Sequence, residues 1–369
     1  MVSDGKICLY IVTFCNRRRI LSDLKFVNFD VLYFCTYRVV YLCIINTSMM
    51  KHQTISIRDD NDAEVLAQAP LIISASRATD IPAFYADWFF SRLEKGYVRW
   101  RNPFSGQDSY VSFGNTRFIV FWSKNPAPLL PHLSWLKERG IGCYIQYTLN
   151  DYESEGLEPN VPTLTQRIDN FRRLVDVLGF GAVMWRFDPL ILTDRITIYT
   201  LLEKIAHIAD VLVGYTEKLV FSFADIESYK KVSRNLRHSG INYSEWDEAT
   251  MREFASRLST LNRDNWNFRL ATCAERIDLS EYGIEHNRCI DPELISRLAP
   301  DEAVLQKFLY NAKTDSGQRK ACGCILSKDI GAYNTCPHGC LYCYANTFSA
   351  SAFENYKRVI ANPHIDSII

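Results

Sequence analysis

The sequence lacks an excess of either charge. Its 369 residues include 42 lysines and arginines and 42 aspartates and glutamates, so the formal net charge at pH 7 is +0. A nucleic-acid-binding protein usually carries a basic surface, so this balance of charges argues against nucleic acid as the main partner. It does not exclude a local basic groove.

The sequence also lacks an apolar run long enough to cross a bilayer. Near the start, Ile7–Phe14 is too short, and the longer run Val31–Ile45 is interrupted by Arg38. A secretory signal has basic residues before its apolar run, whereas three arginines at 17–19 follow this one. We therefore expect a cytoplasmic protein without a membrane partner.

Regular periodicity is missing from residues 1–48, which alternate neither as a helix nor as a strand. We interpret them as an unstructured or non-native extension, with the true start at Met49 or Met50. The alternative is a membrane-associating extension.

No glycine-rich dinucleotide fingerprint follows the first expected strand, which disfavours a Rossmann fold. From Leu71 onward, apolar strands alternate with amphipathic helices, which indicates βαβ units and a parallel sheet. The expected strands are 71–74, 118–122, 143–148, 182–186, 219–223 and 268–272, and the expected helices are 82–93, 126–139, 163–178, 198–213 and 246–261.

A complete or partial TIM-like (β/α) barrel is the most economical closure for this α/β pattern, and a doubly wound open sheet is the alternative. We expect the barrel domain at 70–310, a cysteine-rich iron–sulfur segment packed on it at 311–350, and a C-terminal tail at 351–369.

Polar residues follow most of the expected strands, where (β/α) barrels carry their functional groups. A cation at the inner end of a barrel strand is costly unless it meets an anion, which favours a functional role over a turn or cap role. The expected catalytic residues are Arg77, Lys124, Arg186, Asp188 and Glu275, and Asn125 and Gln146 are expected to bind a cofactor.

Twelve cysteines are present, and Cys336, Cys340 and Cys343 have C-x3-C-x2-C spacing. Soft thiolates select zinc, copper(I) or iron–sulfur clusters. A 4Fe–4S cluster normally takes four thiolates, so three from one loop would leave one iron open. A structural zinc site and a disulfide are the alternatives. We expect His338, inside this motif, to face solvent; the alternative is a hydrogen bond to the cluster.

A second set of thiols precedes this motif. Cys322 and Cys324 have C-x-C spacing, and Cys273 and Cys289 lie upstream. Together they are candidates for a second iron–sulfur or zinc site. One of them could instead complete the first cluster, or all four could be free buried cysteines.

The motif C-x3-C-x-aromatic-C, with Tyr342 as the aromatic residue, resembles the signature of the radical S-adenosylmethionine (SAM) enzymes. The resemblance implies that Cys336, Cys340 and Cys343 hold a 4Fe–4S cluster whose open iron binds SAM. It also implies that Tyr342 lies against the adenine, and we place Asn346 in the same cofactor site. The motif lies near the C-terminus here, whereas in that family it lies near the start of the barrel.

The chain also resembles an uncharacterised domain family that has a radical-SAM-like cysteine cluster at its C-terminus. The motifs that carry this resemblance are Ser76–Pro82, Phe121–Pro126, Trp185–Pro189, Cys273–Glu275, Cys322–Cys324, Ser327–Gly331 and Cys336–Asn346. The cluster loop alone is similar to that of spore photoproduct lyase, often called DNA repair photolyase.

These resemblances imply an enzyme that generates a 5′-deoxyadenosyl radical to act on an unknown substrate, with ferredoxin or flavodoxin as electron donor. One alternative is a non-catalytic electron-transfer or redox-sensing iron–sulfur protein whose cluster is fully ligated. The other is a zinc-stapled nucleic-acid-binding protein, which the neutral charge disfavours.

Overall fold

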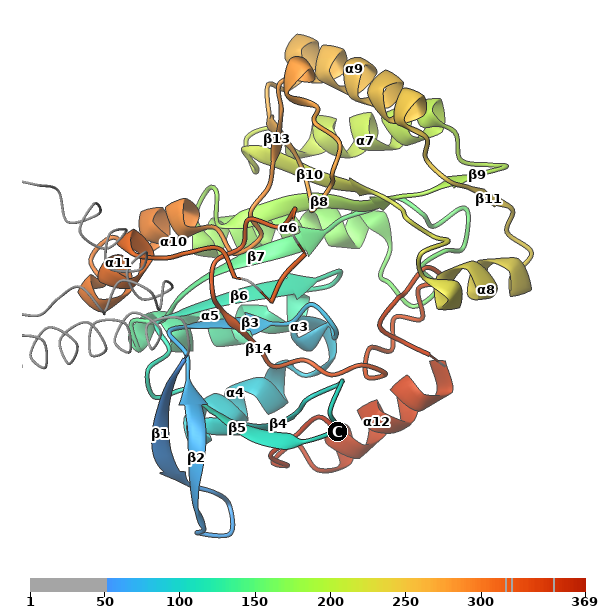
Figure 1. The fold of residues 1–369 in the computed structure, drawn as a ribbon. Coiled ribbons are helices and arrows are strands. Elements are labelled where there is room, and N and C mark those ends of the chain that lie inside the picture. The colour runs from blue at the N-terminus through green and yellow to red at the C-terminus, as the bar shows by residue number, and fades with distance from the viewer. Residues whose placement is uncertain (1–51, 316, 320, 348) are drawn as a thin grey trace, which may run out of the picture. The chain divides into compact units, whose positions relative to one another are not determined.

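The computed structural model describes residues 52–369 except 316, 320 and 348. These residues form one compact unit with two main sheets and surrounding helices (Figure 1). The expectations for residues 1–48 and for the start at Met49 or Met50 lie outside the described residues. Among the helices described, none is both long and apolar enough to span a membrane.

The larger sheet has eight strands in the order β13-β12-β10-β8-β7-β6-β3-β14, and all neighbours are parallel. The strands are β3 (Ile72–Ala75), β6 (Phe118–Ser123), β7 (Gly142–Thr148), β8 (Val183–Leu190), β10 (Lys218–Phe223), β12 (Arg269–Thr272), β13 (Ile284–His286) and β14 (Lys328–Asp329). The expected parallel α/β sheet is confirmed.

From β3 to β13 the strands follow one another in chain order, without the reversal that defines a doubly wound sheet. β14 then returns to pair with β3. Within the described residues no pairing joins β13 to β14, so the sheet ends in two unpaired edges. We call the gap between β13 and β14 the seam.

The six expected strands and five expected helices are present within a few residues. The helices are α3 (Ile81–Phe84), α4 (Ala86–Lys95), η1 (Ala127–His132), α5 (Leu133–Glu138), α6 (Leu164–Leu178), α7 (Ile198–Leu212), α8 (Lys230–His238), α9 (Glu248–Asn265), η2 (Ser280–Tyr282), α10 (Pro292–Leu298), α11 (Ala303–Tyr310) and α12 (Ser349–Ala361). The expected helix 82–93 is divided into α3 and α4, and 126–139 begins as the 3-10 helix η1.

Helix α6 illustrates how local sequence sets an element. The Thr163 hydroxyl accepts a hydrogen bond from the Gln166 backbone, and the Gln166 side chain accepts one from the Thr163 backbone, which together form a capping box. Its buried apolar residues, Ile168, Phe171 and Leu174, recur at helical spacing and belong to the main core. Gly179 ends the helix with a positive φ of 91°.

The large sheet has an apolar core on each of its two faces. Neighbouring residues of one strand belong to different clusters: Ile73 and Ile119 belong to the main core, whereas Ile72 and Phe118 belong to the second. Successive strand residues point to opposite faces, so the two clusters cover opposite faces of the sheet. The second cluster is completed by residues of α10, α11 and the segment 322–325.

The smaller sheet was not expected from the sequence. Its order is β1-β2-β5-β4, with β1 (Gln53–Arg58), β2 (Glu64–Ala69), β5 (Asp108–Ser112) and β4 (Tyr97–Arg101). The expected C-terminal tail packs beside it: Arg99 on β4 pairs with Asp366 at 2.9 Å, and the Trp88 indole donates to the Ile365 carbonyl. The last residues are therefore part of the folded unit. A two-stranded sheet, β9 (Leu192–Thr193) with β11 (Tyr243–Ser244), completes the fold.

Asp329 joins β14 to the end of β3. Its carboxylate accepts hydrogen bonds from the Ser74 and Ser76 hydroxyls, both at 2.7 Å, and from the backbone nitrogens of Arg77 and Gly331, both at 2.9 Å. A side chain at Gly331 would collide with Ser76, because its Cβ would lie 1.7 Å from the Ser76 hydroxyl oxygen. This close approach requires glycine.

We predict that Asp329→Ala lowers the free energy of unfolding by about 2–3 kcal/mol, because it leaves several partly buried donors without an acceptor. Urea denaturation of the full-length protein measures the change. Glu354→Ala, at an exposed site on α12, is the control and should change stability little. Equal stability of the two variants would contradict this role for Asp329.

Candidate functional site

A cavity of about 370 Å³ lies at the carboxyl ends of the strands of the large sheet. Arg77 reaches it from the end of β3, Lys124 from the end of β6 and Asp188 from β8. Ser222 on β10 and Glu275 after β12 also line it. Ligand sites of parallel α/β sheets occupy this edge, so the cavity is the candidate functional site.

The cavity collects most of the residues singled out in the sequence. All five expected catalytic residues line it: Arg77, Lys124, Arg186, Asp188 and Glu275. All seven expected metal ligands line it as well: Cys273, Cys289, Cys322, Cys324, Cys336, Cys340 and Cys343.

Of the expected cofactor-binding residues, Tyr342 lines the cavity, and the other three do not appear among its lining residues. The Gln146 amide instead accepts from Arg186 and donates to the Cys289 carbonyl at 2.9 Å. The Asn346 amide donates to the Cys336 carbonyl at 2.6 Å, and the Asn125 backbone donates to the Ser123 hydroxyl. The structure thus gives these three residues internal hydrogen bonds.

Arg186 and Asp188 form an ion pair on β8. The Arg186 guanidinium donates to Asp188 from two nitrogens, and its Nη1 also donates to Gln146 at 3.1 Å and to the Cys289 sulfur at 3.3 Å. The Ser222 hydroxyl donates to the other Asp188 oxygen. These contacts orient a cation and a carboxylate on the cavity wall.

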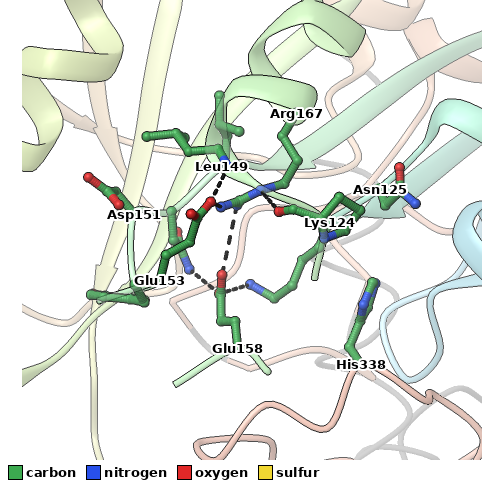
Figure 2. A network of polar contacts seen from close by, with 12 residues as sticks. Lys124, Asn125, Leu149, Asp151, Glu153, Glu158, Arg167 and His338 are labelled. Atoms are coloured by element: carbon green, nitrogen blue, oxygen red, sulfur yellow. Dashed lines mark hydrogen bonds and ion pairs between the residues drawn. The ribbon is translucent and has the colours of Figure 1, made fainter. Parts of the chain in front are cut away.

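Lys124 does not present an uncompensated charge to the cavity. Its ammonium lies 2.8 Å from Glu158 Oε1 (Figure 2). It also lies 2.9 Å from the Tyr342 hydroxyl, and that hydroxyl donates to Glu158. The Asn150 amide donates to the same Glu158 oxygen at 3.0 Å. The aromatic residue of the cysteine motif is therefore held by its hydroxyl in a buried polar network.

Arg167 adds a second cation to this network from α6. Its Nη1 lies 3.8 Å from Glu158 Oε2 (Figure 2), and both of its terminal nitrogens are buried without a hydrogen-bond partner in the described part of the chain. Burial would raise the pKa of Glu158, but Lys124 and Arg167 outweigh burial and lower it to about 2. Glu158 is thus the shared anion of two buried cations.

His338 is buried, with 2% of its surface exposed, so the expectation that it faces solvent is wrong. Its Nε2 lies 2.8 Å from Asp80 Oδ2, and its Nδ1 lies 3.3 Å from the Asn160 carbonyl. Burial would raise the pKa of Asp80, but hydrogen bonds from His338 and Ser123 outweigh it and lower the pKa. His338 anchors the cysteine loop because its ring contacts the buried carboxylate of Asp80 at the start of α3.

The seven cavity cysteines are all free thiols in this structure. Burial raises the pKa of Cys336 to about 12, so its thiol holds its proton at neutral pH unless a metal replaces it. Cys322 and Cys324 contact each other at 2.9 Å, and Cys273 and Cys289 at 3.4 Å. Among the described residues, no group of three or more histidine, cysteine or acidic side chains is arranged so that it could hold a metal ion without some movement.

Glu158 and Arg167 were not predicted from the sequence. Glu158 lies in a polar loop that reads as solvated, and Arg167 lies in an amphipathic helix whose polar residues normally face water. One signal was available: Arg167 stands four residues before Phe171 and seven before Leu174, on the apolar face of α6. A cation at that position must meet a buried anion.

The fold and the cavity define an α/β protein whose parallel sheet carries a thiol-lined pocket at its carboxyl edge. The chain belongs to the family described as Domain of unknown function (DUF1848), whose model matches residues 72–345. This confirms the expected membership of an uncharacterised family. The match includes every strand of the large sheet and all seven cavity cysteines. No curated protein and no solved structure matches the chain.

We predict that Glu158→Gln lowers the free energy of unfolding at pH 7 by about 3 kcal/mol, because it leaves Lys124 buried without a counter-charge and leaves Arg167 with Glu153 alone, 3.7 Å away. Since the folded-state pKa is lowered, the contribution of Glu158 should be present above about pH 4.5 and should disappear as the pH falls toward about 2.

Urea denaturation between pH 7 and pH 3 measures both effects. Glu138→Gln, at an exposed surface pair with Arg139, is the control and should change stability by less than about 1 kcal/mol. The interpretation fails if the Glu158 variant behaves like the control or if its loss of stability does not shrink with falling pH.

Proposed function

We propose that this protein is an iron–sulfur enzyme of the radical-SAM kind, with a 4Fe–4S cluster held by Cys336, Cys340 and Cys343. One observation carries the proposal: these three thiols line the same cavity as Arg186, Asp188 and other residues of both charges at the carboxyl edge of the sheet. Three thiolates leave one iron of a cluster for a small-molecule ligand. The carboxylate, amine and hydroxyls of SAM match a cavity with charges of both signs.

The cysteine loop fits a cluster because it is held from several sides. The Asn160 amide donates to the Pro337 carbonyl at 3.0 Å, and the Leu341 backbone donates to the Leu157 carbonyl at 3.0 Å. His338 is anchored on Asp80, and Tyr342 on Glu158. A loop held in this way restricts the positions of its three thiols, which favours a metal centre.

When bound, a reduced cluster with an open iron supplies one electron that cleaves SAM to methionine and a 5′-deoxyadenosyl radical. In this proposal the chain's own residues bind and orient. Arg186 offers a cation to a carboxylate, and Asp188, held by Ser222, accepts from an amine or a hydroxyl. Tyr342 belongs to the cysteine loop and lines the cavity, which supports its assignment to the adenine site.

The finer architecture in this proposal is a (β/α) barrel that is open at the seam. The sequential strand order and the return of β14 to β3 support it. The proposal also includes a cytoplasmic location and a one-electron donor such as ferredoxin or flavodoxin.

A second candidate is a non-catalytic electron-transfer or redox-sensing protein with a fully ligated cluster. The observation in its favour is that Cys322 and Cys324 line the same cavity as the cysteine loop. Their sulfurs, however, contact each other, and the Cys324 sulfur accepts a hydrogen bond from the Ile290 backbone next to Cys289, which supports a separate role for them.

We predict that protein purified without oxygen contains iron with matching acid-labile sulfide. Cys336→Ala, Cys340→Ala and Cys343→Ala should each lose most of that iron, because each removes one of three ligands. Iron and sulfide analysis measures this, and Cys143→Ala, a thiol in β7 outside the cavity lining, is the matched control. Zinc without sulfide in the wild-type protein would refute the cluster.

We predict that SAM changes the EPR spectrum of the dithionite-reduced protein and that this protein slowly releases 5′-deoxyadenosine and methionine. An open iron is required for both effects. Asp188→Asn should weaken SAM or substrate binding while the iron content stays unchanged, because Asp188 is not a thiol ligand. If SAM leaves the spectrum unchanged while Cys322→Ala alters it, the fully ligated electron-transfer protein is the correct reading.

A further inference from the structure

The other four cavity thiols come from two sides of the seam. Cys273 and Cys289 follow β12 and β13 at one edge of the large sheet. Cys322 and Cys324 precede β14 at the other edge. The Ile325 backbone donates to the Ile290 carbonyl at 3.2 Å, so the two segments already touch there. Four soft ligands therefore gather where the sheet lacks a strand pairing.

The four sulfurs form two close pairs. Cys322 and Cys324 are 2.9 Å apart, and Cys273 and Cys289 are 3.4 Å apart. The backbone nitrogen of Ile290, the residue after Cys289, donates to the Cys324 sulfur at 3.3 Å, which brings the two pairs together. Zinc–sulfur bonds of about 2.3 Å at tetrahedral angles place neighbouring sulfurs about 3.8 Å apart. The thiols thus need only a small separation to surround one ion. The four thiolates of a cubane cluster stand around four irons and are spread much farther.

Two uncharged groups donate hydrogen bonds to these sulfurs. The Ile290 backbone nitrogen lies 3.3 Å from the Cys324 sulfur, and the Asn287 amide lies 3.5 Å from the Cys289 sulfur. Such N–H donors are the usual surroundings of metal-bound thiolates, whose charge they stabilise. A cluster of ordinary apolar thiols would have no need for them.

Two arginines supply the opposite charge: Arg186 is buried and Arg77 is half-buried. Four thiolates around a divalent ion carry a net charge of −2, which is costly to bury without cations. Arg186 Nη1 donates to the Cys289 sulfur at 3.3 Å. Arg77 lines the same cavity, where its guanidinium lies over the Trp122 ring, and its Nη2 is buried without a hydrogen-bond partner in the described part of the chain. Anionic thiolates in this cavity would supply that cation with a counter-charge.

We propose that Cys273, Cys289, Cys322 and Cys324 bind one divalent metal ion, zinc(II) or iron(II), in a tetrahedral site that closes the seam between β13 and β14. Four protein ligands leave no open position, so this centre is structural, in contrast to the three-thiol loop. The site does not depend on the proposed radical-SAM function, because it shares no ligand with Cys336, Cys340 and Cys343.

The test uses the full-length protein with Cys336, Cys340 and Cys343 all replaced by alanine, which isolates the four-thiol site. Cobalt(II) is the probe, added to metal-free, reduced protein without oxygen. We expect a thiolate-to-cobalt charge-transfer band that saturates at one equivalent, displacement of cobalt by zinc, and a higher melting temperature with metal. Iron and zinc analysis of the protein as purified identifies the native ion.

In the same background, Cys289→Ser should lower cobalt affinity more than about 100-fold, beyond the range for losing a supporting group. Cys322→Ser, at a less buried position, provides a second test if Cys289→Ser does not fold. Cys143→Ala should leave the titration unchanged. Folded protein without a charge-transfer band, or binding only of iron with sulfide, would overturn the proposal.

Discussion

The attachment of the cysteine loop to the carboxyl edge of the sheet is the constraint on which the site depends. That attachment is electrostatic: Asp80 holds His338, and Glu158 holds the Tyr342 hydroxyl together with two buried cations. Asp80 and Glu158 lie in segments that follow β3 and β7, and His338 and Tyr342 belong to the cysteine loop. Buried carboxylates need such partners, so removal of the loop would leave Asp80 without His338 and Glu158 without the Tyr342 hydroxyl.

We propose different roles for the two thiol sets because their ligand numbers differ. The three-thiol loop faces the cavity with fewer ligands than a cluster takes, which leaves room for chemistry. The four-thiol group lies where β13 and β14 fail to pair, and it has a full ligand set for one ion. We propose that the three-thiol centre takes part in the reaction and that the four-thiol centre holds the two edges of the sheet together. Arg186 lies between these functions, because it contacts both Cys289 and Asp188.

Periodicity in the sequence was sufficient for six strands of the large sheet, β3, β6, β7, β8, β10 and β12, and for the five expected helices, because each is long enough to show its own apolar pattern. It was not sufficient for β14, whose two residues carry no pattern and which is placed by Asp329. The cysteines and the polar strand ends were predictable because metal-ligand spacing and strand-end position are local signals. Glu158, Arg167 and the buried His338 were not: no periodic pattern shows that the loop holding Glu158 folds back onto α6, and the partner of His338, Asp80, lies 258 residues away in the chain.

Mössbauer spectroscopy of protein labelled with ⁵⁷Fe and prepared without oxygen tests the central claim most directly, because it resolves individual iron sites. The account predicts a 4Fe–4S cluster in which one iron in four changes its isomer shift when SAM is added, since only that iron lacks a thiolate. A cluster whose irons all remain unchanged with SAM, or a spectrum without any cluster, would contradict it.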